Sequence, residues 1–310
     1  MTLEPDAPQS IPVVILTLDT TTRAGSCAVW RGDGMVDEVV GNPEKTHAQR
    51  LPNDLATLLA HHRLKLKDVT LYAIASGPGS FTGLRVGIST MQSLALVHDR
   101  LIVPISSLEA LAYCAAREDP TRALPGTFVG AWMEAYRGEV FCALYRVAQG
   151  ATLIESTNPP RARMSLARLE EVRSPAVGIP EEMSDSWAMA LTAYEPAGLG
   201  GIASLLVIGD AVHGHRPTLT ARIPMASIAL LDHVPIAGMI AELAAREPHR
   251  GVTPYDVVPL YLRRPMAELA RERVEQLEQR IAAAKQPPPE WRRRETGNGS
   301  GNGNGASGSH

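Results

Sequence analysis

The first forty residues predict an antiparallel strand meander, and this order of elements limits the fold more than any other feature. The apolar runs VVILTLD (13–19) and SCAVW (26–30) are separated by the polar turn TTTRAG, and a third run, MVDEVV, follows the turn RGDG. Short apolar runs bounded by turn residues are typical of buried strands. A dinucleotide-binding fold begins instead with a strand that leads directly into a helix. The sequence therefore predicts an α/β protein of a different kind.

Helices are predicted after the meander. Thr46 and Gln49 have the spacing of a capping box, which marks a helix start, and Ser106 with Glu109 repeats it further along. Another helix is predicted over residues 81–98. Apolar residues three or four positions apart define one face of the first helix and of the helix over 81–98; they are Leu51, Leu55, Leu58, Leu84, Ile88 and Met91.

The order of a sheet followed by a helix recurs from about residue 127, which predicts two similar lobes. We place the first lobe at 13–122 and the second at 123–265, after a flexible N-terminal segment over 1–12. The composition changes after residue 265. Residues 266–286 are rich in Ala, Glu, Arg and Gln and predict a C-terminal helix, whereas the Gly/Asn/Ser-rich stretch 287–310 predicts a disordered tail.

The segment SGPGSFTGLRVG (76–87) is the most unusual local motif, since four of its residues are glycines. No Lys-Ser/Thr follows Gly83, so the spacing of a P-loop is absent. Thr82 stands where a dinucleotide fingerprint has its third glycine. Pro78 and Thr82 flank Ser80 at the positions where a nucleophile elbow requires glycine. The standard phosphate and nucleophile motifs are therefore excluded.

Two interpretations of this loop stay open. Its backbone N–H groups precede a helix start, where anions bind, or its glycines allow close packing or a hinge. The turn after the first strand leaves a similar choice, because a comparable turn wraps the phosphates of ATP in sugar-kinase and Hsp70-like ATPases. Asp19 either holds a metal-bound water or caps the hairpin. The candidate cofactor-binding residues at the two places are Asp19, Thr20, Gly77 and Gly79.

Several classes of site find no support in the sequence. Cys27, Cys114 and Cys142 lie far apart, without metal or redox spacing, and no HExxH or His-x-x-x-His pattern is present. The net charge of −3 gives no overall field that favours nucleic acid. No apolar run approaches the roughly 18 residues of a membrane span. We therefore expect a cytoplasmic protein with no membrane segment, no metal and no cofactor.

Seven segments in order, between residue 13 and about residue 264, resemble the bacterial TsaB (YeaZ) family. They are ILTLDTTTRAGSCAVW, THAQRLPNDLATLL, SGPGSFTGLRVGISTMQSLAL, VPISSLEALA, EAYRGEVFCALY, VIGDA and PLYLR. The glycine-rich segment is the most specific. Glu134 and Tyr136 depart from the family, which usually has Asp and Arg at these positions. Residues 157–203 match poorly, and the tail after 265 does not match.

The resemblance implies a two-lobed actin/Hsp70/sugar-kinase-like (ASKHA) fold with mixed sheets flanked by helices. It also implies a non-catalytic scaffold subunit in the synthesis of N6-threonylcarbamoyladenosine next to the anticodon of tRNA. The implied partners are a TsaD-like catalytic subunit, a TsaE-like ATPase, tRNA through the complex, and a second copy in a homodimer. The implied contact residues on the two helices are His47, Arg50, Leu51, Leu55, Leu58, Thr82, Leu84, Arg85, Ile88 and Met91.

Two other functions are alternatives to this one. The first is an active ATPase or kinase of the same fold, which would use Asp19 and the Gly77–Gly83 loop. The second is a peptidase, an older label for relatives of the family, but the sequence holds no nucleophile–base pair and no zinc motif for it.

Overall fold

The structure is a computed structural model that describes residues 13–32, 34, 36–148, 167–194, 203–224, 226–263 and 274. Three predicted segments lie outside the described residues, apart from Val274; they are the flexible N-terminus (1–12), the C-terminal helix (266–286) and the tail (287–310). The described residues up to Leu262 form one compact unit.

The first sheet has the strand order β3-β2-β1-β4-β5. Its strands are β1 (Val14–Asp19), β2 (Ser26–Arg31), β3 (Val36–Val40), β4 (Leu71–Gly77) and β5 (Ile102–Ser106). The first three form the antiparallel meander that the sequence predicts, and β4 and β5 join in parallel. Every residue of β1 and β4 is buried, which explains why these strands are continuous apolar runs rather than alternating ones.

The second sheet repeats this topology. Its strands are β6 (Phe128–Glu134), β7 (Val140–Val147), β8 (Leu169–Gly178), β9 (Ala203–Ile208) and β10 (Ala226–Leu231). Read from β8, the order β8-β7-β6-β9-β10 has the same directions as the first sheet, with an antiparallel meander and two parallel additions. The two-lobed α/β fold of the actin/sugar-kinase type is confirmed. The exact division at residues 122/123 stays a prediction.

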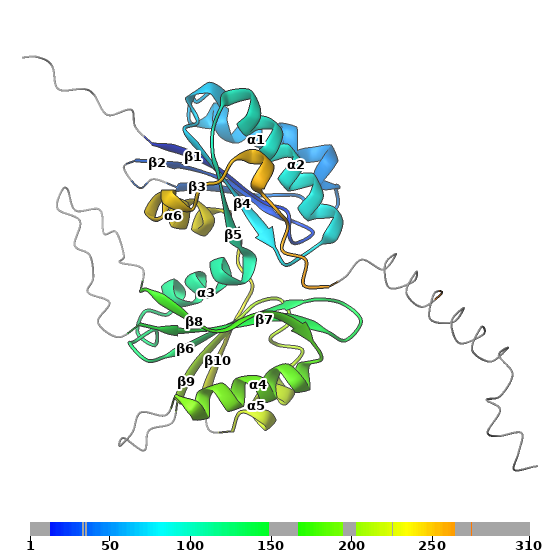
Figure 1. The fold of residues 1–310 in the computed structure, drawn as a ribbon, viewed down its shortest axis with the longest axis vertical. Helices are drawn as coiled ribbons and strands as arrows, with labels where there is room; N and C mark the ends of the chain where they lie inside the picture. The colour runs from blue at the N-terminus through cyan, green and yellow to red at the C-terminus, as the bar shows by residue number, and fades with distance from the viewer. Residues whose placement is uncertain are drawn as a thin grey trace, which may run out of the picture. The chain divides into compact units, whose positions relative to one another are not determined.

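The helices form layers around the two sheets (Figure 1). Helices α1 (His47–His61) and α2 (Phe81–His98) cover the outer face of the first sheet, and α4 (Pro180–Ala193) and α5 (Arg216–Arg222) cover the outer face of the second. Helices α3 (Ser107–Glu118) and α6 (Ala237–Arg246) lie between the sheets. The connecting 3-10 turns are η1 (Leu66–Asp68), η2 (Pro248–Arg250) and η3 (Pro254–Asp256).

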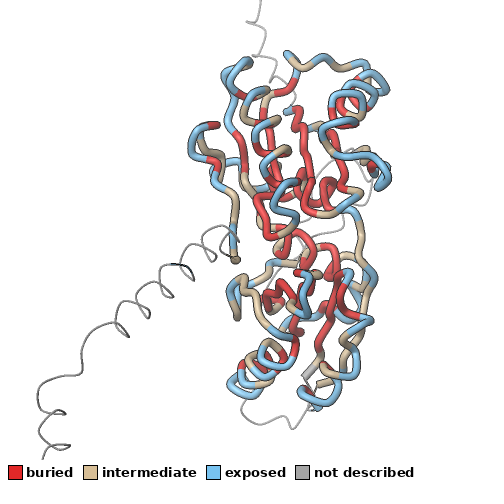
Figure 2. The backbone as a smooth tube through the Cα atoms, turned by 90° about the vertical axis from the view of Figure 1, so that its right-hand side faces the viewer, coloured by how far each residue is buried: buried red, intermediate tan, exposed pale blue. Residues whose placement is uncertain are grey.

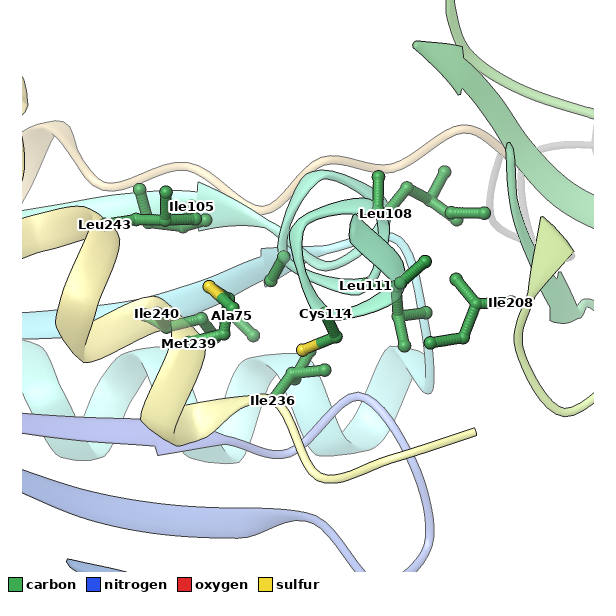
Figure 3. Packing of buried hydrophobic residues seen from close by; sticks show 14 of the residues in the cluster. Ala75, Ile105, Leu108, Leu111, Cys114, Ile208, Ile236, Met239, Ile240 and Leu243 are labelled. Atoms are coloured by element: carbon green, nitrogen blue, oxygen red, sulfur yellow. The ribbon is translucent and has the colours of Figure 1, made fainter. Parts of the chain in front are cut away.

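The largest apolar core fills the space between the two sheets, as the buried segments in Figure 2 show. In Figure 3, Leu111 of α3 lies beside Ile208 of β9, and Met239 of α6 lies on the first-sheet side of Cys114. Helix α6, although it comes late in the chain, is tied to the first sheet, because the hydroxyl of Thr17 lies 3.0 Å from the carbonyl oxygen of Ala237. One continuous core therefore holds both sheets.

We predict that Leu111→Ala lowers the free energy of unfolding by about 2–5 kcal/mol, because the truncation leaves a cavity between the sheets where Leu111 is fully buried. Leu124→Ala is the matched control: Leu124 is 57% exposed, so we expect a change within about 0.5 kcal/mol. Denaturant unfolding followed by circular dichroism measures both. Equal effects of the two substitutions would contradict this account of the core.

Candidate functional site at the turn after the first strand

The turn after β1 is closed by its own acidic residue. Oδ1 of Asp19 accepts hydrogen bonds from the backbone amide of Thr21 at 2.8 Å and from the Thr21 hydroxyl at 2.6 Å. Both residues are buried. Burial raises the pKa of Asp19, against the bonds from Thr21 and the nearby His233 and His47, which lower it. Of the two roles that the sequence leaves open for Asp19, the hydrogen bonds favour the hairpin cap.

The glycine-rich loop is hydrogen-bonded directly to this turn. The amide of Ser80 donates to the carbonyl oxygen of Thr21 at 2.8 Å, and the hydroxyl of Thr20 donates to the carbonyl oxygen of Gly83 at 2.8 Å. The amide of Gly83 in turn donates to Oγ of Ser80 at 3.2 Å, which caps the start of α2. The amides of Ser80 and Gly83 are therefore engaged within the chain and are not free for an anion.

Three glycines of the motif make this contact sterically feasible. A Cβ atom at Gly83 would lie 2.0 Å from the carbonyl oxygen of Thr20, and one at Gly87 would lie 2.2 Å from the Thr20 hydroxyl. At Gly79 it would lie 2.5 Å from Cβ of Thr21. Real Cβ atoms do not approach other atoms this closely, so only glycine lets α2 lie against the threonine turn. Close packing is the interpretation that accounts for these glycines.

The fourth glycine, Gly77, contacts a distant segment of the chain. Its φ of +115° favours glycine, and an added Cβ would lie 3.0 Å from the carbonyl oxygen of Leu260. The amide of Leu260 donates to the carbonyl oxygen of Ser76 at 2.7 Å. The segment that follows η3 therefore covers the end of β4 and the start of the loop.

Helix α1 holds the other side of the turn through a charged clamp. Nη2 of Arg50 donates to the carbonyl oxygen of Ala24 and to Nδ1 of His47 at 2.9 Å, while Nη1 contacts Asp54 Oδ2 at 2.5 Å. Nε2 of His47 lies 3.0 Å from the carbonyl oxygen of Thr22. Because a guanidinium only donates, Nδ1 of His47 accepts, and the ring carries its proton on Nε2. His47 and Arg50 thus fix the turn, although the family resemblance implies that they contact a partner.

The environment of His47 disfavours its charged form. Burial lowers the pKa of His47 from its ordinary value of 6.5, and the neighbouring Arg50 lowers it further. The bond to Thr22 and the carboxylates of Asp19 and Asp54 act in the opposite direction. A proton on Nδ1 would also point an N–H group at the guanidinium. The clamp therefore requires a neutral imidazole.

The structure corrects part of the expected partner surface. The six apolar residues of the two helical stripes are at most 5% exposed, and most of them belong to the core that α1 and α2 form with the first sheet. They are Leu51, Leu55, Leu58, Leu84, Ile88 and Met91. These side chains are not available to a partner. Among the expected contact residues, Thr82 and Arg85 are exposed.

Arg85 belongs to an exposed cluster that the sequence did not indicate. Its Cζ lies 3.9 Å from the centroid of the Phe81 ring, and its Nε donates to the Tyr261 hydroxyl at 3.1 Å. The two rings are 5.1 Å apart. Phe81 and Tyr261 are 180 positions apart in the chain, so no local spacing indicates the contact. Only the path of the segment after η3 brings them together.

The second sheet closes the equivalent turn in the same way. By the repeat of topology, Glu134 at the end of β6 corresponds to Asp19 at the end of β1. Oε1 of Glu134 accepts from the amide of Tyr136 at 2.7 Å, which is the same closure two residues ahead. The amide of Glu134 donates to Oδ1 of Asp210 at 2.8 Å. At both turns the acidic side chain is used to hold the backbone.

Metal and nucleophile chemistry find no cluster in the part of the chain that the structure describes. No group of three or more His, Cys, Asp or Glu residues there is placed to hold a metal ion. Burial raises the pKa of the thiols of Cys27, Cys114 and Cys142 to about 12, so none is a ready thiolate. Among the same described residues, no helix has the length and hydropathy to cross a bilayer.

Comparisons with known proteins point to one family. A family model described as "TsaD: tRNA N6-adenosine threonylcarbamoyltransferase" matches residues 33–223. The "tRNA threonylcarbamoyladenosine biosynthesis protein TsaB" of Escherichia coli K12 is 36% identical over 132 residues, which is 43% of this chain and 54% of that protein. The TsaB of Bacillus subtilis 168 is 29% identical over 161 residues, 52% of this chain and 66% of that protein. The chain spans about half the length of the curated relatives it matches.

A solved structure gives the same result. "YeaZ from Pseudomonas aeruginosa" has a TM-score of 0.59 and 27% sequence identity, over 81% of this chain and 100% of that one. A second crystal structure, of a protein from the same organism described as similar to the peptidase YEAZ, has a TM-score of 0.61 with the same identity and coverage. The likeness extends over both sheets.

We predict that Gly83→Ala destabilises the protein by about 1–3 kcal/mol, because the added Cβ collides with the carbonyl oxygen of Thr20. Gly214→Ala is the matched control, since its Cβ would meet the carbonyl oxygen of Ala211 at an ordinary 3.8 Å. Thermal and denaturant unfolding of the two variants measure the difference. A Gly83→Ala protein as stable as the control would show that the loop does not need this glycine for packing.

We further predict that His47 makes stability depend on pH. Its pKa in the folded protein lies below its ordinary 6.5. Between these two values the unfolded chain binds the proton more readily, so the stabilisation is fully present above about pH 6.5 and is lost as the pH falls through the folded value.

The measurement is the free energy of unfolding from pH 8 to pH 5 for the wild type and for His47→Gln. The stability advantage of the wild type should shrink as the pH falls. His98→Gln should retain the wild-type profile. The raised pKa of Asp19 is common to the wild type and His98→Gln and cancels in their difference. A His47→Gln profile parallel to that of the wild type would refute the clamp.

Proposed function

The chain belongs to the tRNA N6-adenosine threonylcarbamoyltransferase (TsaD) family, and within it is a TsaB/YeaZ protein. On that premise, we propose that it is a non-catalytic subunit in the synthesis of N6-threonylcarbamoyladenosine next to the anticodon of tRNA. The curated relatives are named for this pathway. In this role the fold provides a scaffold, and the chemistry belongs to another subunit.

One observation carries the proposal: the turn after β1 is filled by the chain itself. Thr20 is fully buried and Thr21 is 4% exposed, with the start of α2 in contact with both. A phosphate at this turn would need free amides and room for close approach. The room at the glycines of the loop and of α2 is instead taken by the atoms of Thr20 and Thr21. A filled turn suits a subunit that keeps the fold without binding the substrate.

The proposed partner is a TsaD-like catalytic subunit that contacts the outer faces of α1 and α2, with a TsaE-like ATPase joining the assembly. The outer face of α2 supports this, because it exposes apolar side chains that a protein partner would cover. Phe81 is 39% exposed, Leu96 is 42% exposed and Val97 is 79% exposed. Thr82 and Arg85 are the expected contact residues that this surface retains. A homodimer through the same face is the state that we propose in the absence of the partner.

The alternative, an active ATPase or kinase that uses Asp19 and the Gly77–Gly83 loop, has less support. It needs Asp19 to reach a metal-bound water, whereas Oδ1 of Asp19 is engaged by Thr21. It also needs loop amides that Ser80 and Gly83 use within the chain.

We predict that Arg85→Glu weakens binding to a TsaD-like subunit by about tenfold or more, because arginine and aromatic side chains are enriched among interface hot spots and Arg85 stacks on Phe81. Arg216→Glu, an exposed substitution on α5 at the far face of the second sheet, should bind like the wild type. Size-exclusion co-elution and titration calorimetry measure both.

Two outcomes would overturn the proposed function. One is a wild-type chain that fails to co-elute with the TsaD-like subunit while modification of tRNA proceeds without it. The other is micromolar Mg–ATP binding by the isolated chain that Asp19→Ala abolishes, which would favour the ATPase. If the complex forms but Arg85→Glu does not weaken it, the contact lies elsewhere on the protein.

A further inference from the structure

A row of exposed cations follows helix α1. In the segment between α1 and β4, Leu64 and Leu66 pack against the core of the first sheet, whereas Arg63, Lys65 and Lys67 are exposed. This alternation turns the two apolar side chains inward and leaves the three charged ones in solvent. The leucines therefore anchor the segment and fix where the cations stand.

The sheet topology adds two arginines to the same end of the first sheet. Arg31 ends β2 opposite Val14, the first residue of β1, and its Nη2 donates to the carbonyl oxygen of His62 at 2.9 Å. Arg100 precedes β5, and its Nε donates to the carbonyl oxygen of Val69 at 3.2 Å. Because β1, β4 and β5 are parallel, all begin at this end, opposite the turn that follows Asp19. We call this surface the basic edge: Arg31, Arg63, Lys65, Lys67 and Arg100.

The cations of the basic edge are not held in ion pairs. Among the described residues, none of these five cations takes part in an ion pair. Of the carboxylates close in sequence, Asp37 contacts His62 Nε2 at 2.6 Å and Asp68 accepts from the backbone amide of Lys65 at 2.8 Å. Asp99 is the third. The whole chain has a net charge of −3. A cluster of cations outside ion pairs therefore differs in sign from the net charge of the chain.

The side chains around the row of Arg63, Lys65 and Lys67 favour a nucleic-acid partner over a protein. Protein interfaces centre on apolar and aromatic side chains that are buried on binding. The exposed side chains of residues 61–68 are instead histidine, arginine, lysine and aspartate. The exposed apolar side chains of this end, Val13, Val97 and Leu101, flank Arg31 and Arg100 rather than this row. Lysines on flexible stems act as point charges, which suits a row of phosphates, and each neutralised phosphate releases counterions.

We propose that the basic edge binds the phosphodiester backbone of tRNA, at the end of the first lobe remote from the turn after β1. This inference rests on the proposed function for the identity of the RNA. It gives the chain a direct role in holding the substrate, beyond pairing with a catalytic subunit. The contact is with phosphates, so it is independent of base sequence and weakens with salt.

The test uses the full-length chain and unmodified tRNA that carries a fluorescent label, with anisotropy recorded over a range of salt concentrations. In the variant Arg63→Gln/Lys65→Gln/Lys67→Gln, we expect the slope of log affinity against log salt to fall by about two to three, close to one per lost phosphate contact. The matched control, Arg168→Gln/Arg216→Gln/Arg222→Gln, removes the same charge from exposed positions of the second lobe and should keep the wild-type slope.

Folding and partner binding are followed in the same samples. Circular dichroism checks that the triple variant is folded, and the single variant Lys67→Gln, with an expected slope change of about one, serves if it is not. An unchanged slope in a folded variant overturns the inference. An equal decrease of the salt slope in the triple variant and in the control would indicate a nonspecific effect of charge. That outcome would also overturn the inference.

A triple variant that binds tRNA normally but no longer co-elutes with a TsaD-like subunit would make the edge a protein contact and would equally overturn the inference. Failure of the proposed function is distinguishable, because it appears as loss of co-elution in the wild type. The anisotropy of the chain with tRNA alone still reports on the basic edge in that case.

Discussion

The contact between the start of helix α2 and the turn after β1 is the constraint on which the rest of the first lobe depends. The two backbones are in direct contact there, because the carbonyl oxygen of Thr20 occupies the space that a side chain on residue 83 would need. Two hydrogen bonds, Ser80 to Thr21 and Thr20 to Gly83, fix the register of that contact. Because α2 is placed in this way, its apolar stripe faces the sheet and its opposite side stays in solvent.

The same contact decides what the turn can do. In a fold whose parallel strands end at one edge, the turns after β1 and β6 are where a ligand would be held. Here both turns are closed by their own acid, Asp19 in the first sheet and Glu134 in the second. The His47–Arg50 clamp adds a third set of bonds to the first turn. A site filled by the chain is consistent with a subunit that supports a reaction carried out by another protein.

The aromatic and arginine cluster and the basic edge lie at different ends of the first lobe, and helix α2 runs from one to the other. The aromatic and arginine cluster of Phe81, Arg85 and Tyr261 is at the start of α2, beside the ends of β1 and β4. The basic edge is where those strands begin. A protein partner on α2 and an RNA backbone on the basic edge would use different residues, and they would meet where Leu96 and Val97 lie next to Arg100. The first lobe alone would then carry both contacts.

The sequence by itself determined the local features, because these depend on residues close together in the chain. The strand meander and the capping box in which Gln49 Oε1 accepts from the Thr46 amide at 3.0 Å are both of this kind. For Asp19 the sequence left two roles open, and the hydrogen bonds from Thr21 favour the hairpin cap. Local spacing also predicted one capping box wrongly. Ser106 and Glu109 form no capping box, because the carboxylate of Glu109 pairs with Arg250 at 2.8 Å instead.

Only the tertiary structure decided which face of each helix is buried and what covers it. Periodicity showed that Leu51 and Leu84 belong to apolar stripes, but a stripe suits an internal sheet and a partner equally well. The placement of α6 on the first sheet and the contact of Tyr261 with Arg85 join residues far apart in sequence. Such contacts arise from the path of the whole chain, and no spacing within a short segment encodes them.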